Sequence, residues 1–172
     1  MTDVLVAYAT KMGSTKEIAE AIGERLRAAG HEVTVLDAAQ VRSVEHHSAL
    51  VLGSGLYAGR WRREAVKLLK RNEKLLVDRP TWLFHSGPLG KELTPQQAPR
   101  KVREIAARIG ADEPVTFPGR LTAQTATGFI AKKMAQGDMA GDFRDFDEIR
   151  AWADRVAGQL AAVGSPVPPA GA

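Results

Sequence analysis

The sequence predicts a three-layer α/β domain, in which a five-stranded parallel sheet of doubly wound order 2-1-3-4-5 lies between two layers of helices. Short apolar runs alternate along the chain with segments whose apolar residues recur at helical spacing. The runs 4–8 and 49–53 are apolar throughout, which is typical of strands buried on both faces. Segments rich in glycine and hydroxyl residues follow the first, third and fourth runs, where folds of this class bind ligands.

The first part of the chain is expected to form three strands and one helix. Strand 4–8 leads into a helix over 14–29, whose apolar residues lie three or four positions apart. A glycine follows this helix, as is common just beyond the last turn. A short strand is expected over 32–36. The segment 37–48 is predicted to be a polar connection with a short helical stretch, before the third strand over 49–53.

The remainder of the chain predicts two strands and three helices. In order, we expect a basic helix over 62–76, a strand over 81–85, a helix over 95–109, a strand over 115–121 and a helix from Asp145. Pro95 suits the first turn of a helix, because that position needs no N–H donor. The apolar pattern weakens over 122–141, so we predict a long loop there with one or two helical turns.

Length and composition restrict the class of protein. The 172 residues suit one domain, which we place at 1–163, followed by a disordered tail over 164–172 that contains three prolines and two glycines. The absence of cysteine excludes disulfides, thiolate metal sites and redox thiols, so any redox chemistry requires a bound cofactor. No apolar run reaches the roughly 18 residues of a membrane span, and a strand pattern stands where a signal peptide would be. We therefore expect a cytoplasmic protein.

The segment after the first strand has the features of an anion site. It consists of Thr10, Lys11, Met12, Gly13, Ser14 and Thr15. The first N–H groups of a helix lack intrahelical partners and carry partial positive charge, and neighbouring hydroxyl groups add donors. The segment matches neither a P-loop nor the three-glycine dinucleotide fingerprint. We interpret it as a site for a terminal phosphate monoester, or alternatively as a helix cap formed by Ser14 or Thr15.

The residues also carry a family resemblance. The segment 10–15 resembles the phosphate loop of flavodoxins. Beyond it, the chain is most similar to the flavodoxin-like, menaquinone-dependent protoporphyrinogen oxidase family. The segments that carry this second resemblance are 51–59, 119–121 and 141–145, the last of which leads to Trp152.

This resemblance implies a non-covalently bound FMN whose phosphate lies on segment 10–15. Two further segments would flank the isoalloxazine ring, namely Ser54, Gly55, Leu56, Tyr57, Ala58 and Gly59, and Ser86, Gly87, Pro88, Leu89 and Gly90. Glycines allow the backbone to approach a flat ring, where its N–H groups can hydrogen-bond the flavin N5 and pyrimidine edge. We expect Tyr57 to stack on the ring. For Trp61 we favour packing against the body of the domain over a flavin contact.

One stretch departs from the family. Where the haem-pathway enzymes carry a long aromatic and basic insertion, the segment 122–134 is shorter and contains Phe129 as its one aromatic residue. A porphyrinogen substrate and a membrane contact are therefore not carried over from the family.

Three histidines are weaker candidates. His46 and His47 precede the third strand, away from the predicted ligand edge, and we interpret them as part of a solvated turn. His85 ends the fourth strand, so it either reaches the flavin or is a hydrogen-bonded histidine beside the crevice. No metal site is predicted.

The positive charge of the chain lies largely in one run. The net charge is +4 and the pI about 9.6, which favours anionic partners or reflects a modest basic excess alone. The run consists of Arg60, Arg62, Arg63, Lys67, Lys70, Arg71 and Lys74. Such a run is usually a solvated helix face, but its position beside a flavin segment also suits an anionic substrate or an acidic redox partner. Nucleic acid is not expected, because base-stacking aromatics are not interleaved with the run. A peripheral membrane contact stays open.

The favoured function is an FMN-dependent oxidoreductase of the protoporphyrinogen oxidase-like, quinone-linked type. Its partner would be a redox protein or a small-molecule electron donor or acceptor, with a quinone as one candidate. No side chain stands out as a catalytic acid or base. The first alternative is a flavodoxin-type electron carrier, although such carriers are usually acidic. The second is a flavin-free interaction module, against which the intact hydroxyl segment 10–15 argues.

Overall fold

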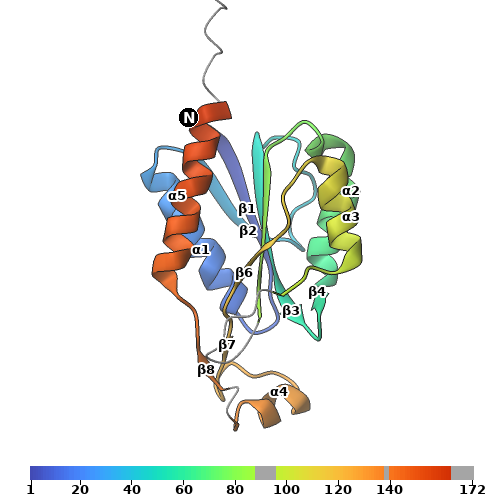
Figure 1. Ribbon diagram of the computed structural model, residues 1–172, viewed down its shortest axis with the longest axis vertical. Coiled ribbons are helices and arrows are strands. Elements are labelled where there is room, and N and C mark those ends of the chain that lie inside the picture. The colour runs from blue at the N-terminus through green and yellow to red at the C-terminus, as the bar shows by residue number, and fades with distance from the viewer. Residues whose placement is uncertain (88–95, 138–139, 164–172) are drawn as a thin grey trace, which may run out of the picture.

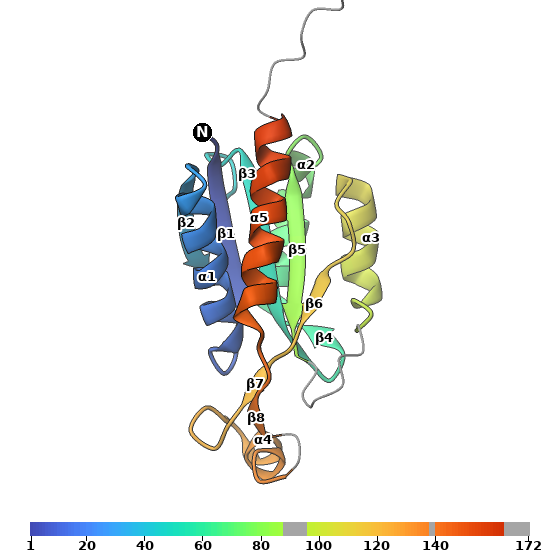
Figure 2. The same cartoon turned by 60° about the vertical axis from the view of Figure 1, so that its left-hand side comes forward.

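The computed structural model describes residues 1–87, 96–137 and 140–163, and in it a central sheet separates two pairs of helices. Helices α1 (Ser14–Ala28) and α5 (Phe146–Val163) cover one face of the sheet (Figures 1 and 2). Helices α2 (Arg63–Leu76) and α3 (Arg100–Ile109) cover the other face (Figure 1). No helix in the described part of the chain is long and apolar enough to cross a membrane.

The sheet confirms the predicted fold and strand order. Its parallel strands follow the order β2–β1–β3–β5–β6, in which β5 and β6 are the fourth and fifth strands expected from the sequence. Their bounds are Asp3–Ala9 for β1, Glu32–Asp37 for β2, Ala49–Tyr57 for β3, Thr81–Ser86 for β5 and Val115–Phe117 for β6.

Two hydrophobic cores hold the layers together, because the central strands are buried on both faces. Alternate residues of β1 point to opposite sides, so Val4 and Val6 join the core under α1 and α5, whereas Leu5 joins the core under α2 and α3. The first core contains an aromatic cluster of Phe84, Phe117 and Trp152, with ring centroids 5.7–5.9 Å apart. This burial explains why the strands read as continuous apolar runs.

The prediction of a glycine-rich loop over 54–59 is wrong for most of its length. Strand β3 continues to Tyr57 and turns back through Ala58 and Gly59 into β4 (Arg60–Trp61), with which it forms a hairpin. Both turn residues have positive φ, at 49° and 70°, as tight two-residue hairpins favour. Within the strand, a Cβ on Gly53 would lie 2.0 Å from the Phe84 ring. This glycine, already within the predicted strand 49–53, leaves room for the aromatic ring.

The predicted fifth strand over 115–121 is also wrong in its second half. The sheet strand β6 ends at Phe117, and Pro118 follows, which has no N–H to continue the ladder. The next strand, β7 (Arg120–Leu121), pairs instead with β8 (Gly141–Asp142) in a separate antiparallel sheet. Between them lies α4 (Phe129–Met134), so the expected loop contains one short helix. We refer to residues 120–137 and 140–142 as the excursion, which extends past the ends of the sheet strands (Figures 1 and 2).

The remaining boundaries differ by a few residues. Helix α3 begins at Arg100 after Pro99, while Pro95, where we expected its start, lies outside the described residues. Helix α5 begins after Asp145, whose Oδ1 accepts hydrogen bonds from the backbone N–H groups of Asp147 and Glu148. The predicted tail over 164–172 also lies outside the described residues.

Candidate functional site

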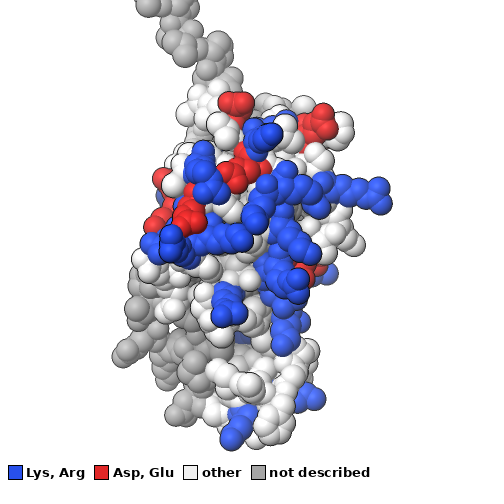
Figure 3. Space-filling model, turned by 90° about the vertical axis from the view of Figure 1, so that its right-hand side faces the viewer, with Lys and Arg blue, Asp and Glu red and all other residues white. Residues whose placement is uncertain are grey.

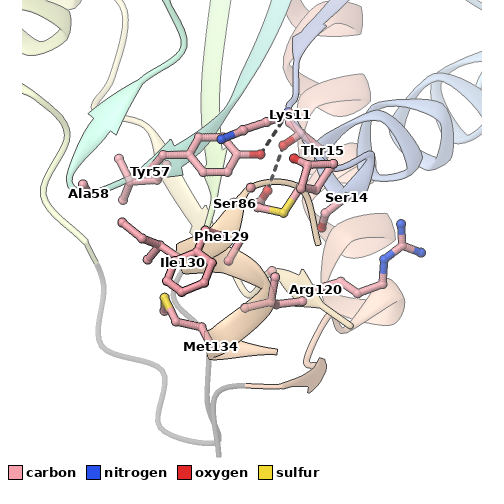
Figure 4. A pocket seen from close by; sticks show the side chains of 18 residues that line it. Lys11, Ser14, Thr15, Tyr57, Ala58, Ser86, Arg120, Phe129, Ile130 and Met134 are labelled. Carbon is pink, nitrogen blue, oxygen red and sulfur yellow. Dashed lines mark hydrogen bonds between the residues drawn. The ribbon is translucent and has the colours of Figure 1, made fainter. Parts of the chain in front are cut away.

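A cavity of about 710 Å³ opens at the carboxyl ends of the parallel strands. Four segments line it, namely the loop before α1, the β3–β4 hairpin, the end of β5 and the excursion (Figure 4). This is the edge at which doubly wound sheets bind ligands, and the volume lies in the range of small-molecule and cofactor sites.

The loop before α1 supplies a polar end to the cavity. Lys11, Met12, Ser14 and Thr15 line it, whereas Thr10 shapes the loop by accepting a hydrogen bond from the Gly13 N–H at 2.9 Å. Gly13 has a φ of +86°, a conformation that side chains disfavour. Helix α1 begins at the next residue, so the unpaired N–H groups of its first turn point towards the cavity.

The hydroxyl groups of this loop do not cap the helix. No side-chain cap bond is present at Gly13, which occupies the capping position. Ser14 is 7% exposed, and its Oγ has no hydrogen-bond partner within the described residues. Thr15 Oγ1 lies 3.0 Å from Ser86 Oγ and so joins the loop to the end of β5. A buried hydroxyl without a partner beside a helix N-terminus fits an anionic ligand better than the capping alternative.

The hairpin contributes three of its six predicted residues to the cavity, which are Leu56, Tyr57 and Ala58. The Tyr57 hydroxyl accepts a hydrogen bond from the Lys11 N–H at 3.0 Å and so connects the hairpin to the first loop (Figure 4). Ser54 is buried instead: its hydroxyl donates to the Gly55 carbonyl and accepts from the Arg62 N–H, both at 2.9 Å. Ser54, Gly55 and Gly59 therefore shape the hairpin and do not line the cavity.

The end of β5 contributes Ser86 and Gly87 to the cavity. A Cβ on Gly87 would lie 2.7 Å from the Leu56 carbonyl oxygen, so only a glycine allows the two chain segments to approach this closely. The other three predicted residues of this segment, Pro88, Leu89 and Gly90, lie outside the described residues.

The excursion forms a fourth wall that we did not predict as part of the site. The wall is apolar, and its principal side chains are those of Leu121, Phe129, Ile130 and Met134. The last three are labelled in Figure 4. Phe129 and Ile130 are 84% and 74% exposed, which is unusual for large apolar side chains. The adjacent pair of large apolar residues in an otherwise polar stretch was the available signal in the sequence.

Ion pairs attach the excursion to the first turn of α1. Glu17 accepts hydrogen bonds from Arg120, at 2.9 Å, and from Arg144. Arg144 is 3% exposed at its side chain and also pairs with Asp142, with an Nη2–Oδ2 distance of 2.6 Å. Burial alone would raise the pKa of Glu17, but the two guanidinium groups outweigh it and hold the pKa below its ordinary value. The Arg144 hydrogen bond likewise lowers the pKa of Asp142.

Arg120 is a cation near the polar end of the cavity. It lines the cavity, and its Nη2 would lie 3.6 Å from a Cβ placed on Gly13. Its Nε is buried and has no hydrogen-bond partner within the described residues. One side of this guanidinium is therefore still available to an anion.

His85 does not line the cavity, so of its two interpretations the hydrogen-bonded histidine is correct. Its Nδ1 accepts a hydrogen bond from Trp61 Nε1 at 3.1 Å, and its Nε2 lies 2.8 Å from Thr116 Oγ1. Burial lowers the pKa of His85 to about 4, so the ring is neutral at pH 7. Trp61 is buried as well, which confirms that it packs against the body of the domain.

The other histidine pair lies far from this edge. His47 Nδ1 contacts Asp3 Oδ1 at 2.7 Å, near the start of β1 at the opposite end of the sheet. No group of histidine and acidic side chains suited to a metal ion occurs within residues 1–87, 96–137 and 140–163.

Comparisons with known proteins agree with this architecture. A family model described as a flavodoxin domain matches residues 5–141. A comparison with curated protein sequences finds no match. Among solved structures, flavodoxin 2 from Bacillus cereus is 20% identical, with a TM-score of 0.61, and the match covers 91% of this chain and 99% of that one.

Two further structures show the same fold. A flavodoxin from the domain Archaea is 18% identical with a TM-score of 0.61, over 92% of this chain and 98% of that one. The rubredoxin oxygen:oxidoreductase of Desulfovibrio gigas is 15% identical with a TM-score of 0.65, over 94% of this chain. This chain spans 37% of that larger protein.

Proposed function

The chain belongs to the flavodoxin domain family, and from this premise we propose that it is an FMN-dependent oxidoreductase acting on an apolar small molecule. Its family supports a flavin-binding redox protein. Enzyme activity and an apolar small-molecule substrate are proposed in addition to that role. One observation carries them, which is the apolar fourth wall of the cavity.

The residues at the polar end suit the phosphate of FMN. The N–H groups of the first turn of α1 and the hydroxyl of Thr15 would donate to it, and the partnerless Ser14 Oγ would gain a partner. Arg120 would balance part of the dianionic charge. Tyr57 and the end of β5 would border the ring. When bound, FMN supplies the hydride or electron transfer, and the protein supplies binding and orientation.

The fourth wall favours an enzyme over a carrier. A carrier needs only an exposed flavin edge from which electrons reach another protein. In this chain, Phe129, Ile130 and Met134 instead border the cavity opposite the phosphate loop and leave apolar surface uncovered. A flat apolar substrate would cover that surface and displace water from it. The resemblance to menaquinone-dependent oxidases supports a quinone as the acceptor, and we assign no porphyrinogen to the site.

The protein side chains at the cavity would position the substrate without proton chemistry of their own. Within the described residues, the titratable side chains that line it are Lys11, Tyr57 and Arg120, and no carboxylate or histidine does so. We therefore expect protons to be exchanged with water.

An electron carrier is the alternative function. It is favoured by the length of the matches, because this chain aligns with 98% and 99% of two stand-alone flavodoxins. Such a carrier would use the same FMN site but would not require the fourth wall.

Two measurements test the proposal. The purified chain should take up FMN, seen as the visible absorption of bound flavin, and a chain that stays colourless after FMN is added would contradict every flavin function. A Phe129→Ser/Ile130→Ser variant should keep its FMN affinity within about twofold but reduce a short-chain naphthoquinone at least about tenfold more slowly, because about two large apolar contacts are lost.

A matched control exists at the other end of the molecule. Val77 is also apolar and exposed, and it follows α2 at the edge opposite the cavity, so Val77→Ser should leave both quantities unchanged. Equal quinone reduction by all three proteins would favour the electron carrier.

A further inference from the structure

The two helical layers of the molecule carry very different charge. Helices α2 and α3 together hold nine Lys and Arg residues against three Glu. Helices α1 and α5 hold five Lys and Arg residues against six Asp and Glu. The positive excess of the chain is therefore concentrated on one side of the sheet, where Lys and Arg side chains extend over much of the surface (Figure 3).

On this side, arginines neutralise the carboxylates and leave lysines without counter-charges. Glu73 pairs with Arg108, and Glu104 pairs with Arg100 at 2.7 Å. The third carboxylate, Glu64, lies 3.5 Å from Arg62. Six exposed cations of α2 and α3 have no ion pair within the described residues. One of them, Arg71, donates a hydrogen bond to the Val41 carbonyl, and we call the other five the basic face: Arg63, Lys67, Lys70, Lys74 and Lys101.

Two members of the basic face lie close enough to repel each other. Lys70 on α2 neighbours Lys101 on α3, and the nearby Lys101 ammonium lowers the pKa of Lys70. The positive charges of these two neighbouring ammonium groups repel each other in the free protein. An acidic surface placed against both helices would remove the repulsion, so the pair favours an anionic partner over open solvent.

The cationic side of the molecule reaches the edge of the cavity. Arg60 pairs with Tyr57 in the β3–β4 hairpin, and Tyr57 lines the cavity. The Arg62 guanidinium lies 6.0 Å from the Tyr57 ring centroid, and α2 begins at the next residue. The N-terminus of α2, with its partial positive charge, is therefore beside the site. A partner held on this side would meet the hairpin edge of the cavity.

We propose that the basic face, together with the hairpin edge of the cavity, docks an acidic one-electron redox protein. This inference rests on the proposed flavin function and names the class of electron donor for it. Each encounter transfers one electron from the reduced donor. Two encounters and two protons from water then supply one two-electron reduction of a quinone-type acceptor to the corresponding diol.

The surface suits an acidic protein better than a lipid bilayer or a nucleic acid. A bilayer would be held by inserted apolar side chains as well as charge. Phe129 and Ile130 belong to the cavity wall, however, and the exposed apolar residues of α2 and its end, Leu75 and Val77, lie at the opposite edge. Nucleic acid would require exposed aromatic rings among the cations, whereas Trp61 is buried.

Rapid mixing with a probe protein tests the docking surface. An acidic [2Fe–2S] ferredoxin, chemically reduced, is mixed with the FMN-loaded chain, and the loss of flavin absorption gives the rate. The rate should fall roughly tenfold between about 20 mM and about 300 mM ionic strength, because salt screens the attraction. Lys70→Gln/Lys101→Gln should be about fivefold slower than the unmodified chain at the lower ionic strength and should converge with it at the higher.

The other helical layer provides a control that removes the same charge. Arg150 and Arg155 are exposed on α5, so Arg150→Gln/Arg155→Gln should change the rate less than about twofold. Neutral photoreduced deazariboflavin should reduce all three proteins equally, which shows that their flavin sites are intact. Equal ferredoxin rates for the two double variants would overturn the docking proposal.

Two further binding measurements distinguish failure of the docking surface from failure of the flavin function. Calorimetric titration of oxidised ferredoxin into the FMN-free chain should show weaker binding by the Lys70→Gln/Lys101→Gln protein. If the chain takes up no FMN but this difference persists, the proposed function fails and the docking surface stands. If the same variant loses binding to phosphatidylserine vesicles while its ferredoxin rate and affinity are unchanged, the basic face binds lipid and the proposal is wrong.

Discussion

The two ends of the cavity are built in different ways. The phosphate-loop end rests on the central sheet, since the loop follows β1 and Thr15 is joined to Ser86 at the end of β5. The α4 end rests on a two-residue strand pair, a small cluster of Leu121, Ala126 and Ala135, and the ion pairs of Glu17. Large cores therefore position the end that would hold the cofactor, whereas charges attach the end that would meet the substrate. Substitutions at one end should therefore alter cofactor binding, and substitutions at the other end should alter substrate choice.

The largest effect should be the destabilisation of the phosphate-loop end by acid, through protonation of His85. Burial lowers the pKa of His85 in the folded protein to about 4, below its ordinary value of 6.5, so protonation favours the unfolded chain. The free energy of unfolding should be highest above pH 6.5 and fall by about 3 kcal/mol as the pH drops to about 4, since each pKa unit corresponds to about 1.36 kcal/mol. Urea unfolding across this range measures it. His85→Gln should remove this pH dependence, and an unchanged slope in the variant would contradict the assignment.

Thr15→Val should be the next largest effect, and it acts on ligand binding at the same end. The variant keeps the shape of the side chain but removes a hydroxyl from the loop that would hold the phosphate. FMN affinity should weaken by about 1.5–3 kcal/mol, as expected for a lost hydrogen bond to a charged group. Riboflavin has no phosphate, so its affinity should change little. An equal loss for both flavins, measured by fluorescence titration, would place Thr15 away from the phosphate.

Arg144→Gln tests the attachment of the other end. The guanidinium is buried, but its carboxylate partners Glu17 and Asp142 are 42% and 45% exposed, so solvent screens part of the interaction. We expect the free energy of unfolding to fall by about 2 kcal/mol, below the 3–5 kcal/mol of a fully buried pair. FMN affinity should fall less than in Thr15→Val. The control is Arg150→Gln, whose partner Asp147 is 97% exposed and whose loss should cost less than about 0.5 kcal/mol.

The smallest effect concerns the pH at which the excursion loosens. Glu17 and Asp142 have folded pKa values below their ordinary values of 4.5 and 3.8, so their stabilisation is complete above those values and is lost as the pH falls below them. Protection of the excursion from amide exchange should therefore decrease below about pH 4.5. This pH range is lower than the one in which protonation of His85 reduces stability. Glu17→Gln should shift that onset. Simultaneous loosening of both ends between pH 6.5 and 4 would show that they are not separately held.

Local sequence patterns predicted some elements around the cavity and missed others. Strands such as 4–8 and 49–53 are predictable because burial on both faces leaves a continuous apolar run, and the loop at 10–15 is predictable because it directly joins such a strand to a helix. The end of β3 was misassigned because Ser54 and Gly55, predicted as loop, pair with His85 and Ser86 of β5, which lie 31 positions later in the chain. The register of a distant strand decides that contact, and no local pattern reveals it.

The sequence by itself determined the parallel sheet, its strand order and the polar end of the cavity, because these depend on local periodicity and on one strand–turn–helix junction. Only the tertiary structure decided that His85 is buried and hydrogen-bonded to Trp61 and Thr116, and that α4 closes the apolar end of the site. Both depend on contacts between segments far apart in the chain. The Glu17–Arg144 pair, which joins residues 127 positions apart, is the clearest case, because ion pairs of this range leave no periodic signal.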